Sequence, residues 1–534
     1  MQIKKVFYIL ITSLLLMLSM TTNKKINAIP NDDLIVYKFL DDSYKTTKLH
    51  DYTEETYNPE DRKWQGIPQI AVSNGGRIWA SWYSGGDKEP STDNYIILSY
   101  SDDGINFVDP FIIIDHADYE RRVFDPVLFL DAEKNELWIY FCFNGYGKTY
   151  IKITNPDASP EDITWTPAYN TGFGNFIHPT FVTDSGEWLI PTQLSTSEIS
   201  IMTSVDSGRA WIQKTIVKTS PMNKTSHECQ LVQLSNNEMW LLARIDSGYN
   251  GGIERWISLD GGTTFNFHSD NMESPLCGPG SKFCIKRLSS GTLLMVNNNS
   301  VSHRSEIVAF YSTDNGSTWK KGITLDYRND VTYPEIAVDK NDSIYVIWDK
   351  GRYAEHEIRY SRFTEADLFS GVMVDENDKN SIVISRVNSS YRDIESTDPT
   401  IERVKYYDLG TEKSVIINDL PTSFKIICED NKEIDVTGKW KPVEYDKDTL
   451  GTYRFYFIND SLLPLNYSDG KDLLSCYVIL QEKEPEEQQP PVEPNNKTGE
   501  EKKGCKSSIS ASLATVSLGL FSAGIILKKK KEQQ

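Results

Sequence analysis

The sequence predicts an all-β fold in which a six-bladed β-propeller is followed by a small β-sandwich and a C-terminal transmembrane helix. Two short patterns recur with nearly the same period of about 50 residues, which is typical of propeller blades. Aromatic residues make up 11% of the chain, which favours strands over helical bundles. With 534 residues, the chain is long enough for several domains.

The first pattern is Ser-x-Asp-x-Gly-x-x-aromatic, which suits a tight turn. Asp can accept hydrogen bonds within the turn, Gly can adopt a positive φ, and the ring can fill the space under the hairpin. Three full copies, 54 residues apart, occur at Ser204–Trp211, Ser258–Phe265 and Ser312–Trp319. An earlier copy, Asp102–Phe107, lacks the leading Ser in register and begins 104 residues before Asp206. We therefore expect one hidden copy between them, with Asp157–Trp165 as a degenerate candidate.

The second pattern is a turn residue followed by an apolar strand. Its six copies, spaced 51 to 59 residues apart, begin at Arg77, Glu136, Glu187, Glu238, Thr292 and Ser343. Because two unrelated patterns share one period, we predict six four-stranded blades over residues 55–375, rather than an ordinary sandwich with chance spacing. Loops from all blades of a propeller meet at one mouth of its channel, so a ligand site is expected there.

These turns resemble the Asp-boxes of the sialidase, or neuraminidase, superfamily over roughly residues 60–370. In that family the boxes lie on outer turns and are not catalytic. Its site pairs a tyrosine nucleophile with a glutamate, holds the sugar carboxylate with three arginines and uses a loop aspartate as acid/base. The resemblance implies that Glu228 is the glutamate, that Arg244 and Arg304 are the second and third arginines, and that Tyr333, before Pro334, is the nucleophile.

These residue types suit retaining hydrolysis through a tyrosyl–sugar intermediate. The usual pKa of a phenol is about 10, so Glu228 beside Tyr333 would take its proton during attack. A neutral phenol is repelled less than an anion by a carboxylate on the anomeric carbon, and arginine fits a carboxylate with paired hydrogen bonds. Each residue alone could be structural, as a strand-end carboxylate, a core ring or a blade-to-blade ion pair. Their joint order along the blades favours a site.

One arginine of the expected set is missing. The family carries it in an Arg-Ile-Pro motif, whereas this sequence has Gly66-Ile67-Pro68. Another guanidinium could replace it, from Arg62, Arg121 or Arg122, and we take Arg122 as a substrate-binding candidate. A two-arginine site could also bind a carboxylate sugar, or the site could serve another glycan.

The acid/base residue is expected on a Gly-Gly loop of the first blade. That loop offers Asp87, Glu89 and Asp93; spacing does not choose among them, and we favour Asp93. Asp125 and His178 lie in strand-entry segments of the second and third blades, where they could face the same mouth or make structural contacts.

Residues 395–481 are predicted to form a separate β-sandwich. Four strands are expected, at residues 422–428, 433–440, 451–457 and 473–480. The run around Trp440 and the following strand loosely resemble bacterial immunoglobulin-like surface modules, which usually act as spacers or bind carbohydrates or partners. Cys428 and Cys476 lie on candidate strands and could pair or remain free thiols.

The two ends of the chain carry targeting signals. Residues 1–28 have a basic start and a 15-residue apolar run, which predicts a signal peptide rather than an N-terminal anchor. Residues 482–506 are predicted to be a disordered Glu- and Pro-rich linker. The uncharged run 507–527 predicts a transmembrane helix, or else a transient sorting signal, before a basic cytoplasmic tail at 528–534. We therefore expect an exported protein on the extracellular face of a Gram-positive-type cell membrane.

Composition narrows the function classes. The net charge of −20 argues against a nucleic-acid partner, and seven cysteines without a CxxC motif exclude a zinc ribbon. Dinucleotide and P-loop motifs are missing from the sequence, and no cofactor or metal is predicted. The prediction is an exo-α-sialidase-like glycoside hydrolase acting on sialoglycoconjugate-type glycans. The alternatives are a non-catalytic propeller lectin or adhesin, and a glycosidase for another sugar, because Gly66 stands in place of the first arginine.

Overall fold

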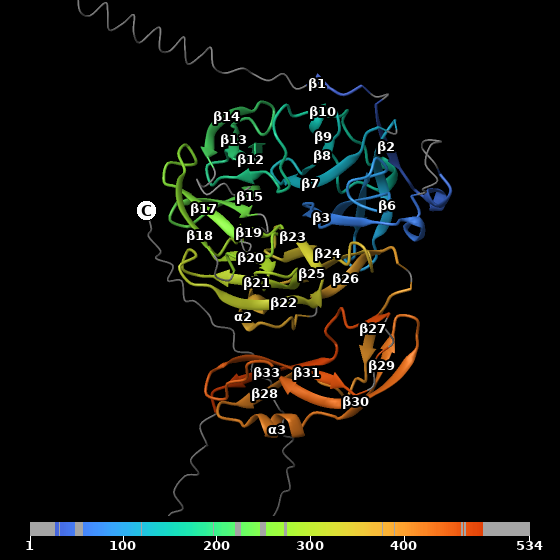
Figure 1. The fold of residues 1–534 in the computed structure, drawn as a ribbon, viewed down its shortest axis with the longest axis vertical. Helices are drawn as coiled ribbons and strands as arrows, with labels where there is room; N and C mark the ends of the chain where they lie inside the picture. The colour runs from blue at the N-terminus through green and yellow to red at the C-terminus, as the bar shows by residue number, and fades with distance from the viewer. Residues whose placement is uncertain are drawn as a thin grey trace, which may run out of the picture. The chain divides into compact units, whose positions relative to one another are not determined.

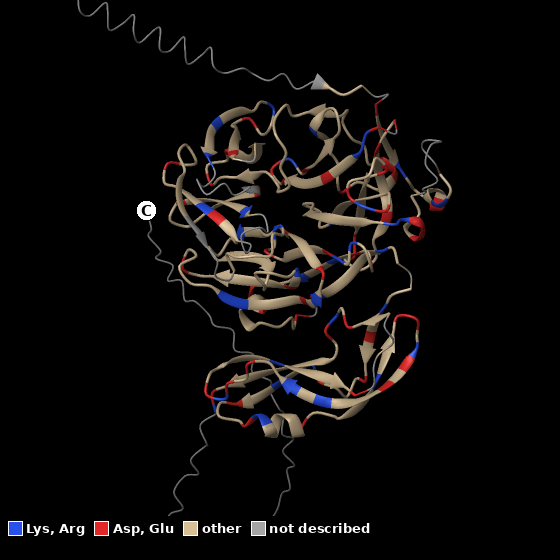
Figure 2. Cartoon of the chain, in the orientation of Figure 1, with Lys and Arg blue, Asp and Glu red and all other residues tan. Residues whose placement is uncertain are grey.

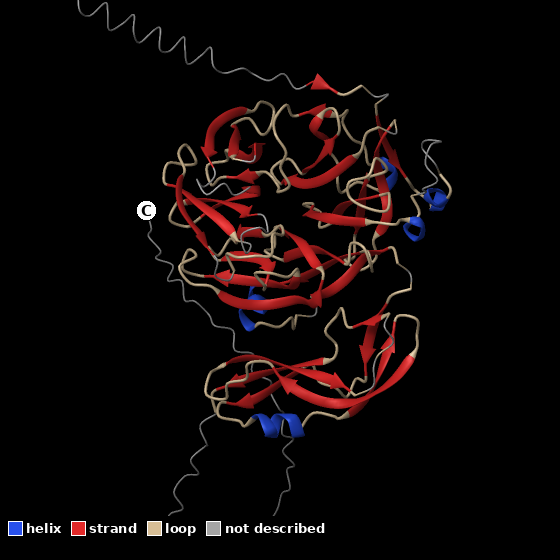
Figure 3. Cartoon of the chain, viewed as in Figure 1, coloured by secondary structure: helices blue, strands red, loops and turns tan. Residues whose placement is uncertain are grey.

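The computed structural model describes residues 27–30, 33–47, 57–118, 120–195, 197–218, 226–245, 252–271, 275–375, 377–388, 390–460, 463 and 466–483. These residues form a ring of six small sheets and one larger sheet (Figures 1 and 3). Acidic and basic residues are interspersed along the strands (Figure 2). The short helices among them are η1 (Asp42–Lys45), η2 (Pro59–Asp61), η3 (Pro160–Asp162), α2 (Glu365–Ser370) and α3 (Lys413–Asn418). The predicted all-β fold is confirmed.

Each blade is an antiparallel sheet of four strands that follow one another in the chain. Blade one contains β3 (Gln65–Val72), β4 (Ile78–Ser84), β5 (Tyr95–Ser101) and β6 (Val108–His116). Blade two contains β7 (Val123–Asp131), β8 (Glu136–Phe143), β9 (Gly147–Ile153) and β10 (Tyr169–Asn170). Blade three contains β11 (Phe181–Val182), β12 (Trp188–Ser195), β13 (Glu198–Ser204) and β14 (Ile212–Lys218).

The second half of the ring follows the same plan. Blade four contains β15 (Ser226–Gln233), β16 (Met239–Ile245), β17 (Ile253–Ser258) and β18 (Asn266–Asn271). Blade five contains β19 (Cys284–Arg287), β20 (Leu293–Asn298), β21 (Ser305–Ser312) and β22 (Lys320–Asn329). Blade six contains β23 (Val331–Val338), β24 (Ile344–Lys350), β25 (Glu357–Phe363) and β26 (Lys379–Arg386). The predicted count of six blades is confirmed.

The repeated turn-and-strand pattern marks the second strand of every blade. All six copies coincide with the starts of β4, β8, β12, β16, β20 and β24. The last blade ends at Arg386 rather than near residue 375, because α2 and the segment after it are inserted between β25 and β26.

Asp-box turns join the third and fourth strands of blades three, four and five. In the first of these turns, Ser204 Oγ donates to Asp206 Oδ1 at 2.8 Å and accepts from the Gly208 N–H at 2.9 Å. The same two contacts recur at Ser258 and Ser312. Gly208 has φ 78°, and a Cβ there would lie 3.0 Å from Trp138 of the preceding blade. Each box therefore shapes a hairpin and also packs it against a neighbour.

The first Asp-box is shifted by one residue from the predicted register. Asp103, and not Asp102, accepts from Ser101 Oγ at 2.9 Å, so the leading Ser is present and the box is one residue shorter. Asp102 instead pairs with Arg77 at 2.7 Å.

The expected hidden copy has the predicted place but lacks the predicted contacts. Asp157–Trp165 lies in the connection between β9 and β10, the blade-two equivalent of the other boxes, and contains η3. Asp157 accepts from the Gly75 N–H of blade one at 2.9 Å rather than from its own turn. This segment therefore makes a contact between blades one and two, where the other boxes stabilise a hairpin turn.

Each pair of neighbouring blades encloses its own apolar core. Six separate clusters of buried side chains correspond to the six blade interfaces. The largest fully buried rings in them are Trp64, Trp79, Trp82, Trp256 and Trp348. Because burying a large apolar side chain stabilises a fold by about 1.5–3 kcal/mol, these interfaces hold the ring together and leave the channel to other residues.

Two N-terminal strands extend the ring outward. β1 (Asn27–Ala28) pairs with β10, and β2 (Leu34–Lys38) pairs with β6. Blade six takes all four of its strands from residues 331–386, and blade one takes its four from residues 65–116, with β2 added at the outer edge. The contact between these two blades, called the seam below, is made by groups such as Gln65 Nε2, which donates to the His356 carbonyl at 2.6 Å.

The C-terminal module is one curled sheet rather than a sandwich of two sheets. Its strands, in the order β28-β33-β31-β30-β29-β27-β32, are β27 (Arg392–Thr397), β28 (Val404–Asp408), β29 (Ser423–Cys428), β30 (Glu433–Pro442), β31 (Gly451–Asn459), β32 (Tyr467–Ser468) and β33 (Ser475–Gln481). The sheet curls because β30 pairs with β29 along its first half and with β31 along its second half. The core includes Trp440, Phe424 and Phe457. Cys428 and Cys476 are buried free thiols.

Most of the predicted targeting segments lie outside the described residues. This applies to the signal peptide up to residue 26, to the linker from residue 484, and to the whole of 507–527 and 528–534. In the part of the chain that the structure describes, no helix is long and apolar enough to cross a membrane. These segments therefore stay predictions.

Candidate active site

Four residues at one end of the channel share an unusual backbone conformation. Ile67, Asp125, Glu228 and Tyr333 have φ angles of 58°, 49°, 53° and 55°. Each lies at a register shift in the first strand of its blade, where a bulge interrupts the ladder. Left-handed φ values cost non-glycine residues about 1–3 kcal/mol and concentrate at functional sites. All four residues line one cavity of about 130 Å³.

Tyr333 in β23 is held between a carboxylate and a guanidinium. Its phenol donates to Glu228 Oε1 at 2.7 Å and accepts from Arg244 Nη1 at 2.8 Å. The same Arg244 nitrogen lies 2.6 Å from Glu228 Oε2. Burial, and next the Glu228 carboxylate, raise the pKa of Tyr333. The phenol therefore keeps its proton at neutral pH and donates it in a hydrogen bond to the Glu228 carboxylate.

Two further arginines flank the ring of Tyr333. Arg304, just before β21, donates to the Gly280 carbonyl at 2.9 Å, and its Cζ lies 5.6 Å from the ring centroid. Arg352, just after β24, lies closer, with its Cζ 4.1 Å from the same centroid. Together with Arg244, three guanidinium groups thus approach one phenol from blades four, five and six.

The loop of blade one places Glu89, rather than the favoured Asp93, in the cavity. Asn94 ties this loop together, because its amide donates to the Gly85 carbonyl at 2.5 Å and accepts from the Ser91 N–H at 2.8 Å. Asp93 accepts from Ser91 Oγ at 3.3 Å and is not among the cavity-lining residues. Glu89 lines the cavity, and burial raises its pKa.

Asp87, the third candidate of this loop, is exposed. The choice among the three acids therefore depends on how Asn94 closes the loop.

Asp125 joins the site, whereas Arg122 stands beside it. Asp125 lines the cavity, its Oδ2 accepts from Asn175 Nδ2 at 3.2 Å, and burial raises its pKa. The Arg122 guanidinium stacks on Phe124, with its Cζ 3.6 Å from the ring centroid, and does not line the cavity.

The other two arginines considered as replacements lie elsewhere. Arg62 is buried against Asp109, 2.7 Å away. Arg121 lies 3.1 Å from Asp118 and stacks on Phe143.

A buried charge cluster lies deeper in the channel. Lys282 Nζ donates to Glu335 Oε2 at 2.6 Å, and His178 Nδ1 lies 3.3 Å from the same oxygen. Burial alone would raise the pKa of Glu335, but the Lys282 ammonium and His178 outweigh it and bring that pKa to about 2. His178 is buried beside Glu335 and is not among the residues that line the cavity at the mouth, and burial lowers the pKa of its imidazole. Glu335 follows Tyr333 by two residues, so the cluster anchors the strand that carries the phenol.

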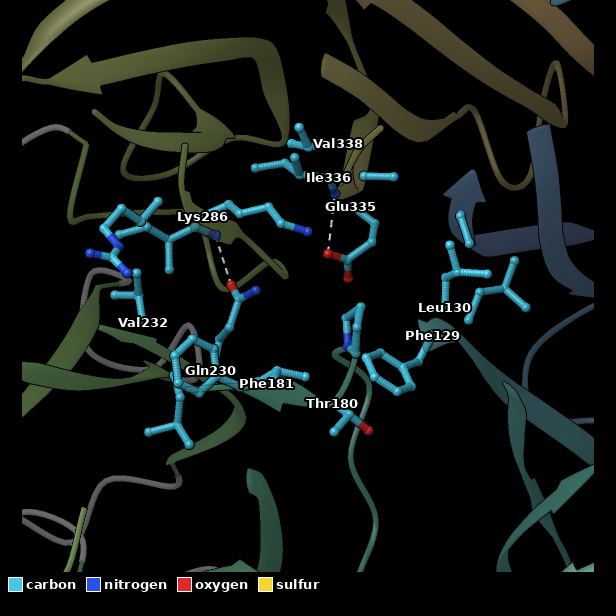
Figure 4. A pocket seen from close by; sticks show the side chains of 18 of the residues that line it. Phe129, Leu130, Thr180, Phe181, Gln230, Val232, Lys286, Glu335, Ile336 and Val338 are labelled. Atoms are coloured by element: carbon cyan, nitrogen blue, oxygen red, sulfur yellow. Dashed lines mark hydrogen bonds between the residues drawn. The ribbon is translucent and has the colours of Figure 1, made fainter. Parts of the chain in front are cut away.

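The far end of the channel has a different character (Figure 4). The first strands of all six blades line a wider cavity there, of about 410 Å³. Its walls mix apolar side chains, such as Phe129 and Val232, with polar and charged ones, such as Gln230, Lys286 and Glu335. One polar contact in the view is the Ile285 N–H, which donates to Gln230 Oε1 at 2.7 Å.

The near end can perform acid–base and nucleophilic chemistry with its own side chains. It combines a protonated phenol, a carboxylate bonded to it, and a second carboxyl group whose pKa is raised. Such a pair of carboxyl groups in different environments can divide the roles of base and acid. Among the described residues, no group of His, Cys, Asp and Glu could hold a metal ion.

Sequence reasoning missed Arg352. Arg244 lies within the second strand of blade four, whereas Arg352 stands two residues after the end of the second strand of blade six, so the blade period does not relate the two positions. Nothing in the sequence pairs it with residues of blade one, because that contact crosses the seam.

Comparison with known proteins gives one family and several solved structures. The profile of the BNR repeat-like domain matches residues 76–346. A Hadza microbial sialidase is 15% identical with a TM-score of 0.45, and the match covers 57% of this chain and 66%, just under two thirds, of the sialidase. No curated protein matches the chain.

Two further structures have similar figures. The intramolecular trans-sialidase from Ruminococcus gnavus is 13% identical with a TM-score of 0.43, and the match covers 57% of this chain and 95% of that one. The GH93 α-L-arabinofuranosidase of Fusarium graminearum is 12% identical with a TM-score of 0.39, with 57% and 94% covered.

Proposed function

This chain belongs to the BNR repeat-like family, and from that premise we propose that it is a retaining exo-glycosidase that removes terminal acidic sugars, of the sialic acid type, from glycans. The observation that carries the proposal is the 2.7 Å hydrogen bond from Tyr333 Oη to Glu228 Oε1 at the mouth of a six-bladed ring. A site for binding alone has no need of a nucleophile bonded to its own base.

The first chemical step forms the sugar–enzyme bond. Tyr333 Oη attacks the anomeric carbon while its proton passes to Glu228. The bond between that carbon and the leaving oxygen breaks as Glu89 protonates the oxygen. Arg244, already 2.8 Å from the phenol oxygen, stabilises the negative charge that develops on it.

The second step releases the sugar. A water molecule attacks the same carbon and gives its proton to Glu89, which now acts as a base. The bond to Tyr333 breaks, and the phenol regains its proton from Glu228. Two displacements at one carbon retain the anomeric configuration. The raised pKa of Glu89 suits this residue to the first role, because a buried carboxyl group stays protonated to higher pH.

The arginines support an acidic substrate. Arg244, Arg304 and Arg352 all contact the Tyr333 side chain, so a carboxylate next to the reacting carbon would meet guanidinium groups. The cavity that holds Glu89 and Asp125 borders the same phenol and offers room for the sugar ring.

The decisive experiment is hydrolysis of a panel of fluorogenic glycosides by residues 29–483, with sialosides, uronides, α-L-arabinofuranosides and neutral hexosides included. We expect release from an acidic α-ketoside and, by proton NMR at early times, a first product with the configuration of the substrate. Inversion would remove Tyr333 as nucleophile. Binding of a glycan without turnover of any substrate would favour the lectin or adhesin alternative.

We also propose that the protein acts outside the cell, held by residues 507–527. The support is the uncharged run and its lysine tail in the sequence. Deleting residues 507–534 should release the protein into the medium, as followed by immunoblotting of cell and medium fractions. Equal partitioning of truncated and full-length protein would contradict the anchor.

A further inference from the structure

We propose that Arg352 of blade six supplies the guanidinium that position 66 of blade one does not, and that Gly66 is glycine because Arg352 fills its side-chain space. The inference rests on the proposed function and names the groups that recognise the anionic part of the substrate. It makes anion binding a property of the seam, since one side chain from blade six completes a site bordered by blade one.

The space at position 66 is occupied. A Cβ on Gly66 would lie 2.9 Å from Arg352 Nε, 3.1 Å from its Cδ and 3.2 Å from its Cγ. These are atoms along the middle of the arginine side chain, so a rotation of the guanidinium end would not clear them. Gly66 and Arg352 are therefore a matched pair, and a residue with a side chain at position 66 would displace the arginine.

Arg352 is held in place by a buried carboxylate. Its Nε and Nη2 lie 2.9 Å and 2.8 Å from Asp349 Oδ2. Asp349, which is 1% exposed, also accepts from the Ile67 N–H at 2.8 Å and from Thr332 Oγ1 at 2.6 Å. The Asp349 carboxylate thus links Arg352 both to Ile67, which follows Gly66, and to Thr332, which precedes Tyr333.

The guanidinium faces the reacting groups. Its Cζ lies 4.1 Å from the ring centroid of Tyr333, and its Nη1 lies 3.7 Å from Glu89 Oε2. The distance to Glu89 is longer than a hydrogen bond, so this nitrogen can turn to a better acceptor. A substrate carboxylate beside the phenol is such an acceptor. Arg304 lies farther from the same ring, with its Cζ 5.6 Å from the centroid.

A purely structural role for Arg352, in which it only holds blades one and six together, predicts a different result. Loss of such a contact would weaken the binding of every ligand and lower the melting temperature. Loss of an anion-binding group would weaken only ligands that carry the anion. The two roles are therefore separated by comparing an acid with its neutral ester.

The experiment uses residues 29–483 and two probes, 2-deoxy-2,3-dehydro-N-acetylneuraminic acid and its methyl ester, with Kd measured by calorimetry and unfolding followed by circular dichroism. We expect Arg352→Ala to weaken binding of the acid by roughly 10- to 100-fold and binding of the ester by less than about threefold. Arg352→Lys should recover part of the loss. The matched control is Arg287→Ala at the far end of the channel, where Arg287 pairs with Asp184, and it should bind like the wild type.

The most discriminating variants move the arginine from position 352 to position 66. Gly66→Arg alone should weaken binding of the acid, because two side chains compete for one space. The double variant Gly66→Arg with Arg352→Ala should bind the acid more tightly than Arg352→Ala alone. Equal losses for acid and ester in Arg352→Ala, or wild-type affinity in that variant or in Gly66→Arg, would overturn the inference. So would a wild-type protein that hydrolyses only neutral glycosides, which leaves the glycosidase assignment intact. A wild type that binds the acid but hydrolyses nothing would end the proposed function alone.

Discussion

The two ends of the channel are built by the same inner strands, yet they differ in backbone and in chemistry. At the near end, β3, β7, β15 and β23 each carry a bulge and a residue with left-handed φ. A few residues further along, the strands return to a regular ladder and line a wider cavity whose walls mix apolar and polar side chains (Figure 4). The strained residues of these four strands thus lie at one end, whereas charged side chains occur at both.

This contrast shows how a propeller carries strain without losing its fold. The bulges cost about 1–3 kcal/mol each, but every bulged strand continues into a paired, buried segment that belongs to the cores between blades. The near end is free to hold reactive groups because the far end and the blade interfaces supply the stability. Substitutions at the two ends should therefore separate activity from folding.

The largest effect is expected at the proposed nucleophile, Tyr333. Tyr333→Phe removes the attacking oxygen, so kcat should fall at least about 10³-fold while Kd for 2-deoxy-2,3-dehydro-N-acetylneuraminic acid changes little. Steady-state kinetics and calorimetry on one preparation check both parts. Tyr37→Phe, at a half-exposed ring on β2, is the control and should keep full activity. Near-normal turnover by Tyr333→Phe would show that the near end works by another route.

The next largest effect is expected at the proposed acid, Glu89. Glu89→Gln cannot protonate a leaving oxygen, so kcat/KM should fall about 10²- to 10⁴-fold. Because burial raises the pKa of Glu89, wild-type activity should decline as the pH rises through that pKa, and the variant should lose this limb of the pH profile. Asp93→Asn is the paired control and should cost less than about threefold. The reverse ranking of the two variants would return the role to Asp93.

Between the two ends, the charge cluster should govern stability. Glu335→Ala leaves Lys282 buried without its carboxylate, which typically costs about 3–5 kcal/mol in the free energy of unfolding. Because the pKa of Glu335 is about 2 in the folded protein, against 4.5 ordinarily, its contribution is full above about pH 4.5 and is lost as the pH falls toward 2.

Urea unfolding of wild type and Glu335→Ala from pH 6 to pH 2.5 measures this contribution. The difference between the two proteins should shrink over the acid part of the range. A difference that stays constant would mean that Glu335 acts by packing and not by charge.

The smallest effect is expected at the far end. Lys286 projects into the wide cavity, away from the reacting groups, so Lys286→Ala should leave kcat/KM within about twofold of the wild type and barely move the melting temperature (Figure 4). A tenfold loss of activity would break the comparison, because it would make the far cavity part of the site.

The period of the sequence was enough to predict the ring. The six second strands begin where the repeats place them, because each blade is a local unit with its own turn chemistry. The shifted box at Asp103 shows the limit of such patterns. A one-residue deletion left the Ser101 contact intact but hid it from a fixed spacing.

The site was less predictable, because its geometry depends on contacts that cross blades. The resemblance pointed to Tyr333, Glu228, Arg244 and Arg304, and the structure brings them together. The choice of Glu89 depends on how Asn94 closes a loop, which spacing does not reveal. Arg352 depends on its fit against a glycine 286 residues earlier in the chain.

The seam also sets an order in time. A ribosome makes Gly66 among the first residues of the ring and Arg352 among the last, so early blades can pair and pack while the polypeptide still lacks the groups that would bind an anion. Tyr333 is synthesised equally late. A nascent chain, or a fragment cut before blade six, would therefore lack both Tyr333 and Arg352. The cavity is complete only when the last blade stands beside the first, because it takes Ile67 and Glu89 from blade one and Tyr333 from blade six.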